Sequence, residues 1–303
     1  DYPLIPFYIF YSMFGFQRVG DLAWAAGDIQ ARGFLLGGTA GRTTLNGEGL
    51  QHQDGHSHLV AATVPNCVAY DPTYGYELAV IIQDGLRRMY AEQEDVYYYI
   101  TVMNENYRQP ELPEGCEEGI LRGMYRLEAD SKGRRKKSAK AVQLLGSGTI
   151  LLEVRAAAEM LRADHGVAVD VWSVTSFNEL RRDGLATDRW NLLHPEVTPR
   201  VPWVARCLEE VDAPVVAATD YMKAFADQVR TWAPRDYRVL GTDGFGRSDT
   251  REKLRHFFEV DRRWVVIAAL KALADRQAIP AKEVAAAIEK YGIDPDKPDP
   301  VTV

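Results

Sequence analysis

Residues 142–174 read VQLLGSGTILLEVRAAAEMLRADHGVAVDVWSV, and this stretch decides the fold class. Its apolar start, Val142 to Leu145, is typical of a buried strand, and Gly146-Ser147-Gly148 is a tight turn. Ile150 to Ala163 has the apolar spacing of a helix, and Val167 to Val174 is a second strand. Strand, helix and strand with short connections form a parallel sheet covered by helices, so the sequence predicts an α/β fold.

The same alternation extends in both directions from this unit. Downstream, strands are expected at Val215–Ala218 and Tyr237–Leu240, and helices at Met222–Trp232, Thr250–Phe258, Arg262–Arg276 and Ala281–Tyr291. Upstream, strands are expected at Ile5–Tyr11, Val64–Ala69 and Val96–Val102, and helices around Val19–Ala26 and Tyr76–Tyr90. Both halves therefore repeat strand and helix, as a doubly covered sheet requires.

The length of 303 residues predicts two domains, because compact domains usually contain about 100 to 200 residues. The segment Asp130 to Lys140, DSKGRRKKSAK, is polar and basic, which is typical of a linker or surface hairpin. An electrostatic docking patch is the alternative. We expect a first domain over residues 1–130, a linker over 131–140 and a second domain over 141–303.

Composition limits the classes of binding partner and the cellular location that we expect. Charged residues make up 26% of the chain and hydrophobic ones 46%, as in globular proteins, and the net charge of -7 disfavours nucleic acid and anionic membranes. Cys67, Cys116 and Cys207 are isolated, so neither a disulfide framework nor a cysteine-rich metal site is expected, and a cytoplasmic location fits. The apolar run Tyr2–Phe16 has neither the basic start of a signal peptide nor the length of a membrane span.

Gly37 to Gly49, GGTAGRTTLNGEG, contains too many glycines for a helix or a central strand. It lacks the Gly-Lys-Ser/Thr of a phosphate-binding P-loop. A surface loop and an active-site loop both remain open, because long loops inside compact domains are often functional.

Three of the six histidines follow at His52, His56 and His58. General acid/base chemistry suits histidine, and structural histidines are the alternative. A metal site is a third possibility, but no HExxH helix or cysteine partner supports it, so we predict that this loop holds no metal.

Two further segments carry open alternatives. Tyr11 to Phe16, YSMFGF, is typical of core packing or of an apolar wall for a flat heterocycle. Gly241 to Asp249, GTDGFGRSD, lies between a strand and a helix and could bind an anion, but a plain turn capped by Asp249 or Thr250 is preferred.

These segments together carry a resemblance to a known family. The strings FYIFYSMFGFQRVGDLAWAAGDIQARGFLLGGTAGRTTLNGEGLQHQDGHSH, TDYMKAFADQVRTW and YRVLGTDGFGRSDTREKLRHFFEVD closely resemble the homodimeric bacterial pyruvate dehydrogenase E1 components. The resemblance runs along nearly the whole chain. It implies two three-layer α/β domains of transketolase-like type: most of the pyrimidine-binding domain, then the transketolase C-terminal domain.

The resemblance also implies a cofactor site for thiamine diphosphate. Phe14 matches the aromatic residue on which the aminopyrimidine ring stacks, and Tyr11 matches a residue that lines the same pocket. His52 matches the histidine that reaches toward the reacting carbon, and Glu48 falls at a position implicated around the same site.

The implied activity is decarboxylation of pyruvate followed by reductive acetylation of the lipoyl domain of dihydrolipoamide acetyltransferase (E2), by a homodimer. The motif that holds Mg²⁺ and the diphosphate, and the glutamate that activates the aminopyrimidine, have no counterpart in the 303 residues. We therefore expect this chain to be a C-terminal portion that is inactive alone. The rivals are a transketolase, a 2-oxoglutarate-type E1, or a structural and interaction module without chemistry of its own.

Overall fold

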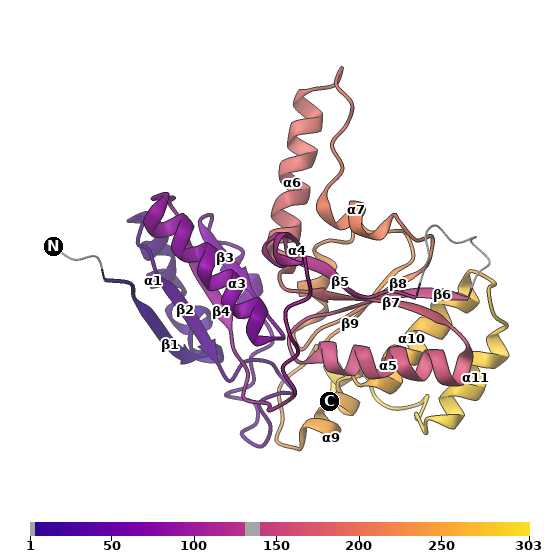
Figure 1. The fold of residues 1–303 in the computed structure, drawn as a ribbon. Helices are drawn as coiled ribbons and strands as arrows, with labels where there is room; N and C mark the ends of the chain where they lie inside the picture. Colours follow the sequence, from indigo (N-terminus) through magenta and orange to yellow (C-terminus); the bar gives the residue numbers. More distant parts are fainter. Residues whose placement is uncertain (1–3, 131–139) are drawn as a thin grey trace.

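The computed structural model describes residues 4–130 and 140–303, which form two sheets, each covered by helices on both faces (Figure 1). The predicted pair of three-layer α/β arrangements is confirmed. Within the described ranges, no helix has the length and apolar character that a membrane span requires.

The first sheet is entirely parallel and has the order β1 (Phe7–Tyr11), β2 (Phe34–Gly38), β4 (Tyr97–Thr101), β3 (Cys67–Tyr70). One face is covered by α3 (Gly75–Leu86), which continues into the turn Arg87–Ala91, and by α4 (Glu117–Arg122). The other face is covered by α1 (Phe16–Asp28) and α2 (Ser57–Ala61). Successive side chains of β4 point to opposite faces of the sheet, so this strand contributes to the core on both sides. Tyr98 packs toward α3, and Tyr97 and Tyr99 pack toward α1.

One strand departs from the sequence-based expectation. The segment Gly37–Gly49 was expected to contain no central strand, and this is wrong for Gly37 and Gly38, which end β2 between two neighbours. The reason is close packing, since a Cβ on Gly37 would lie 2.6 Å from the Tyr99 hydroxyl and 3.0 Å from Ser12 Cβ. Glycine is therefore used here because other side chains fill the space beside the strand.

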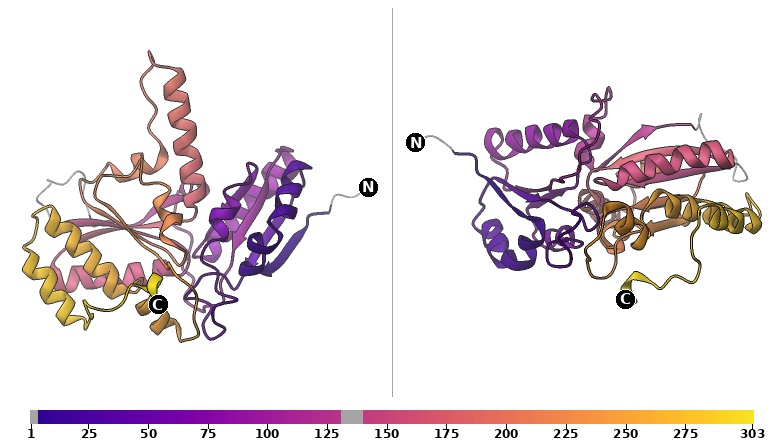
Figure 2. Two further views of the ribbon diagram at one scale, coloured as in Figure 1. Left: turned by 180° about the vertical axis from the view of Figure 1, so that it is seen from behind. Right: turned by 90° about the horizontal axis from the view of Figure 1, so that it is seen from below.

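The second sheet has the order β5 (Met124–Glu128), β7 (Ala168–Val174), β6 (Ala141–Gly146), β8 (Val215–Ala218), β9 (Tyr237–Leu240). Only β5 pairs in the antiparallel sense. One face packs on α5 (Ile150–His165), α10 (Arg262–Asp275) and α11 (Ala281–Lys290). The other packs on α6 (Phe177–Leu193), α7 (Trp203–Leu208) and α8 (Lys223–Asp227), and α6 projects beyond the body (Figures 1 and 2).

The boundary between the sheets falls between β4 and β5, so β5 joins the second sheet although it precedes the expected linker. Residues 131–139 of that linker lie outside the described residues. Near the chain end, α9 (Arg251–Phe257) begins at Thr250, whose hydroxyl accepts a hydrogen bond from the Lys253 amide, so Thr250 is the predicted cap.

A buried cluster of polar side chains from both domains joins the two sheets. The Thr101 hydroxyl donates to Asp71 Oδ1 at 2.6 Å, and its oxygen lies 3.0 Å from His58 Nε2. The Tyr221 hydroxyl, from the second domain, donates to the same Asp71 oxygen at 3.4 Å. Burial, only partly offset by the Thr101 hydrogen bond, raises the pKa of Asp71 to about 7. Burial lowers the pKa of His58 to about 4, so this imidazole is uncharged at neutral pH.

The raised pKa makes stability depend on pH in a defined direction. The folded state keeps a proton on Asp71 that the unfolded chain has lost, so this contribution falls as pH rises from about 4 to about 7. We expect the unfolding free energy of wild type minus that of Asp71→Asn to fall by roughly 1 kcal/mol per pH unit across that window. His58 titrates in the opposite sense but is present in both proteins. Urea unfolding at several pH values measures the difference, and a difference independent of pH would contradict the assignment.

Candidate cofactor-facing site

Three aromatic rings from separate segments meet at the carboxyl ends of strands β1 and β2 of the first sheet. Tyr11 ends β1, Phe14 lies in the 3₁₀ turn after it, and His52 comes from the loop that follows β2. The His52 ring centroid lies 5.4 Å from that of Tyr11 and 5.0 Å from that of Phe14, and the latter two are 5.6 Å apart. The fourth candidate, Glu48, places Oε2 at 3.4 Å from His52 Nδ1, an ion-pair distance rather than a hydrogen bond. The structure therefore brings all four sequence-predicted residues together.

The aromatic segment divides between core and surface. Phe16 is buried against Tyr99, with ring centroids 4.8 Å apart, whereas Tyr11 is 44% exposed and Phe14 is half-buried. Arg18 lies over Phe14, its guanidinium carbon 4.2 Å from the ring centroid. Core packing is thus realised in Phe16, whereas Tyr11 and Phe14 face outward and form an apolar wall. That a flat heterocycle stacks on this wall stays a prediction.

The histidines of the loop differ in their surroundings. His58 is buried between Tyr99, Tyr221 and Phe225, as a structural histidine would be. Of the three, only His52 contacts the outward aromatic wall. In the described parts of the chain, no group of three or more histidine, cysteine or carboxylate side chains could hold a metal ion. The absence of a metal from this loop stays a prediction.

The turn within the histidine loop is organised by Asp54. Its buried carboxylate accepts hydrogen bonds from Gln17 Nε2 at 2.7 Å and from the amides of His56 and Ser57, both at 3.0 Å. A carboxylate with this many donors stays in one place. The backbone that follows His52 is therefore fixed to α1 through Gln17.

A carboxylate from the second domain, Asp220, holds the loop that carries Glu48 and His52. It accepts four hydrogen bonds: from the Thr43 amide at 2.9 Å, the Thr43 hydroxyl at 2.6 Å, the Thr44 amide at 3.0 Å and the Thr44 hydroxyl at 2.6 Å. Gly41 lies beside it with φ of +88°, and a Cβ there would lie 2.3 Å from Asp220 Oδ2. Sequence reasoning missed Asp220; the only signal was an acidic residue just beyond a predicted strand.

The loop is also tied to the segment Gly241–Asp249. The Gly47 amide donates to the Asp249 carbonyl at 3.1 Å, and the Arg247 amide donates to Gln53 Oε1 at 2.8 Å. Gln53 in turn donates to the Leu45 carbonyl at 2.8 Å. The glycine-rich loop is therefore clamped along its length by the second domain and is no free surface loop.

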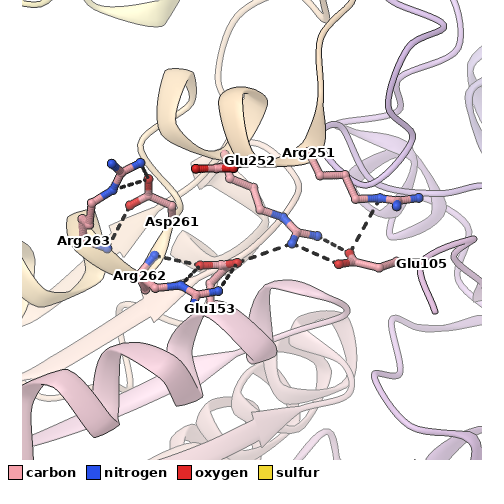
Figure 3. Close-up of a pocket in the computed structure, with 8 residues that line it drawn as sticks. Glu105, Glu153, Arg251, Glu252, Asp261, Arg262 and Arg263 are labelled. Carbon is pink, nitrogen blue, oxygen red and sulfur yellow. Dashed lines mark hydrogen bonds and ion pairs between the residues drawn. The ribbon is translucent and has the colours of Figure 1, made fainter. Parts of the chain in front are cut away.

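A charged cavity of about 500 Å³ lies between the domains, where acidic and basic side chains pair with one another (Figure 3). Arg255, only 5% exposed, binds Glu105 of the first domain and lies 3.4 Å from Glu153 of α5. Arg262 pairs with the same Glu153 at 2.9 Å. Because these charges neutralise one another, the cavity fits a junction between domains better than a ligand site.

Two protein-family models match this chain, one over each domain. The family model for the pyruvate dehydrogenase E1 component middle domain matches residues 1–110, and that for the transketolase-like TK C-terminal domain matches residues 123–261. The pyruvate dehydrogenase E1 component of Pseudomonas aeruginosa is 67% identical over 300 residues, which are 99% of this chain and 34% of that protein. That of Escherichia coli K12 is 65% identical over 302 residues, 98% of this chain and 33% of that protein.

Solved structures show the same fold at low sequence identity. A transketolase from Campylobacter jejuni has a TM-score of 0.65 at 17% identity, over 88% of this chain and 36% of its own. A structure described as a split gene transketolase, inactive β4 tetramer, has a TM-score of 0.63 at 17% identity, over 89% of this chain and 77% of its own.

The fold and the two matched family models place the chain in the transketolase-like fold class. Within it, the chain belongs to the pyruvate dehydrogenase E1 component family. It spans about a third of the length of the curated relatives that it matches.

The Asp220 contacts predict a local effect of substitution. In Asp220→Asn one acceptor oxygen becomes a donor facing the threonine donors, so we expect faster amide hydrogen exchange at Thr43 and Thr44 and a loss of about 1 to 3 kcal/mol in stability. Asp249→Asn, the same change at an exposed residue of the second domain, is the matched control. Unchanged exchange at both threonines would show that Asp220 does not hold the loop.

Proposed function

We propose that this chain supplies the pyrimidine-facing wall of a thiamine diphosphate site and the acid/base histidine of a pyruvate dehydrogenase E1 component. The observation that supports this most is the convergence of Tyr11, Phe14 and His52, from three segments, on one outward-facing surface. A flat heterocycle fits such a wall because aromatic faces stack with a modest gain beyond simple burial.

Each residue has a distinct role in this proposal. Phe14 and Tyr11 orient the aminopyrimidine ring by stacking and keep water from that side. Glu48 lies beside Nδ1 of His52 and orients the imidazole, which leaves Nε2 to exchange a proton with the reacting molecule. The cofactor, when bound, supplies the electron sink for decarboxylation. Positioning and proton transfer are then what the chain itself contributes.

The activity of the complete protein follows from the family. We propose oxidative decarboxylation of pyruvate and reductive acetylation of the lipoyl domain of dihydrolipoamide acetyltransferase (E2), by a homodimer in the cytoplasm. Mg²⁺ and the diphosphate would be held by parts of the protein outside these 303 residues, so the chain alone would be inactive. The proposed division is a pyrimidine-binding domain over residues 1–130, a linker over 131–140 and a transketolase-like C-terminal domain over 141–303, except that β5 pairs with the sheet of the second domain and is counted with it.

A chimera tests this proposal directly. These 303 residues would replace the matching third of the Escherichia coli relative, and pyruvate decarboxylation would be measured in the purified protein. We expect His52→Ala to lower turnover by roughly 10² to 10⁴, the usual contribution of a positioned acid/base, with little change in thermal stability. His56→Ala, in the same loop but away from the aromatic wall, is the control. Wild-type turnover in His52→Ala would refute the role of His52.

Phe14→Ala in the same chimera should mainly weaken cofactor binding. Loss of stacking and ring burial is worth on the order of 1 to 3 kcal/mol, which is about 5- to 150-fold in affinity. The affinity for thiamine diphosphate is measured at saturating Mg²⁺. Tyr8→Ala is the control, because Tyr8 is an exposed aromatic residue of β1 outside the group of three rings. Unchanged affinity together with easier unfolding would show that Phe14 belongs to the core.

A further inference from the structure

A second cavity, of about 440 Å³, lies between the two domains, and it adjoins the aromatic wall because Arg18 lines it and also lies over Phe14. Its apolar lining comes from Met13, Leu50, Met222 and Phe245, and its polar lining includes Arg18, Arg42 and His56, together with Gln51 and Gln53. Among the described residues that line it there is no carboxylate. Three groups that carry or can accept positive charge therefore face an otherwise apolar space.

Arg42 is the residue that this cavity leaves unsatisfied. Its side chain is only 7% exposed, yet within the described chain it has no hydrogen-bond or ion-pair partner, and its Nε is fully buried. The guanidinium packs flat on Gly55, where a Cβ would lie 2.0 Å from Nη2 and 2.5 Å from Nε. A buried guanidinium without an acceptor is costly, so its surroundings favour an anion.

The nearby carboxylates do not meet this requirement. Asp54, Asp220 and Asp243 attract Arg42 only through space. Their oxygens accept hydrogen bonds from the backbone amides of Ser57, Thr44 and Lys223. Burial is the larger effect, and it lowers the pKa of Arg42. The donors of Arg42 that face the cavity therefore remain available for an acceptor that enters it.

The lining also selects the kind of anion. A planar carboxylate matches the two-pronged donor geometry of one guanidinium, whereas a doubly charged phosphate would need more buried cations than Arg42 alone. Arg18 is exposed and lies over Phe14, so it contributes at the rim. The methionine, leucine and phenylalanine side chains would cover an alkyl or similar apolar chain of a few carbons.

We propose that this cavity is a binding site for a carboxylate with a short apolar chain, with Arg42 as its anchor. The site is distinct from the wall of Tyr11 and Phe14 and does not depend on the reaction proposed above. Its ligand enters with the carboxylate toward Arg42 and the chain toward Met222 and Phe245.

Calorimetry on the 303-residue chain tests the proposal with three probes. Hexanoate has the charge and the chain, hexanamide has the chain without the charge, and acetate has the charge without the chain. We expect hexanoate to bind about tenfold tighter than either of the other two, because a charge-assisted hydrogen bond and buried methylenes both contribute. Absence of hexanoate binding, or equal binding of hexanamide, would overturn the proposal.

Variants connect the binding to this cavity. Arg42→Gln should abolish the preference for hexanoate over hexanamide, with folding checked by circular dichroism. If Arg42→Gln does not fold, Leu50→Glu tests the site instead. It places a competing carboxylate at the half-exposed rim of the cavity and should weaken the affinity for hexanoate about tenfold. Leu192→Glu, at an exposed leucine of α6, is the matched control and should change nothing.

A final experiment distinguishes a free ligand from a side chain of the complete protein as the occupant of the cavity. The same titration is made on the chimera with the Escherichia coli relative. Binding there supports the proposal. Loss of binding there, with binding to the 303 residues retained, would show that a carboxylate of the complete protein already occupies the cavity, and would overturn it.

Discussion

The arrangement of the site depends on one buried carboxylate. Asp220 follows β8 in the second domain, and its four hydrogen bonds from Thr43 and Thr44 fix the start of the loop that ends at His52. Burial raises the pKa of Asp220, and the charge of Arg255 and the hydrogen bonds from Thr43 and Thr44 oppose that rise. The two threonines and the aspartate therefore stabilise each other. The position of His52 beside Tyr11 and Phe14 is therefore set from the neighbouring domain as much as from its own.

This constraint explains what the second domain contributes. The loops that meet at Asp220 leave the carboxyl ends of the parallel strands β2 and β8, the edge at which α/β proteins place their ligands. In the first domain that edge presents Tyr11, Phe14 and His52, whereas in the second it presents groups that hold the loop of the first. The second domain thus holds the loop of the first, and in the function proposed above its role is support for the site.

Sequence patterns predicted the α/β class because β4, β6 and β7 are largely apolar or aromatic runs, which is typical of strands buried on both faces. They missed β2 because the need for glycine at Gly37 comes from Tyr99, a partner about sixty residues away. Tyr11, Phe14, His52 and Glu48 came from the resemblance. The residues of the aromatic segment alone favoured core packing, because burial of Phe16 and exposure of Tyr11 depend on strands far along the chain. Asp220 was out of reach for the same reason, as its partners lie 177 positions earlier.

Two buried arginines at the same junction show how differently one side chain can be used. Arg255 is neutralised by Glu105 and Glu153, carboxylates from two different elements, so its burial joins the domains. Arg42 is buried to a similar extent, but it packs on Gly55 and its donors find no acceptor among the described residues. Since burial is costly for both guanidiniums, the difference lies in what surrounds them. The side of the junction that carries the histidine loop is therefore the side where an anion from outside would gain most.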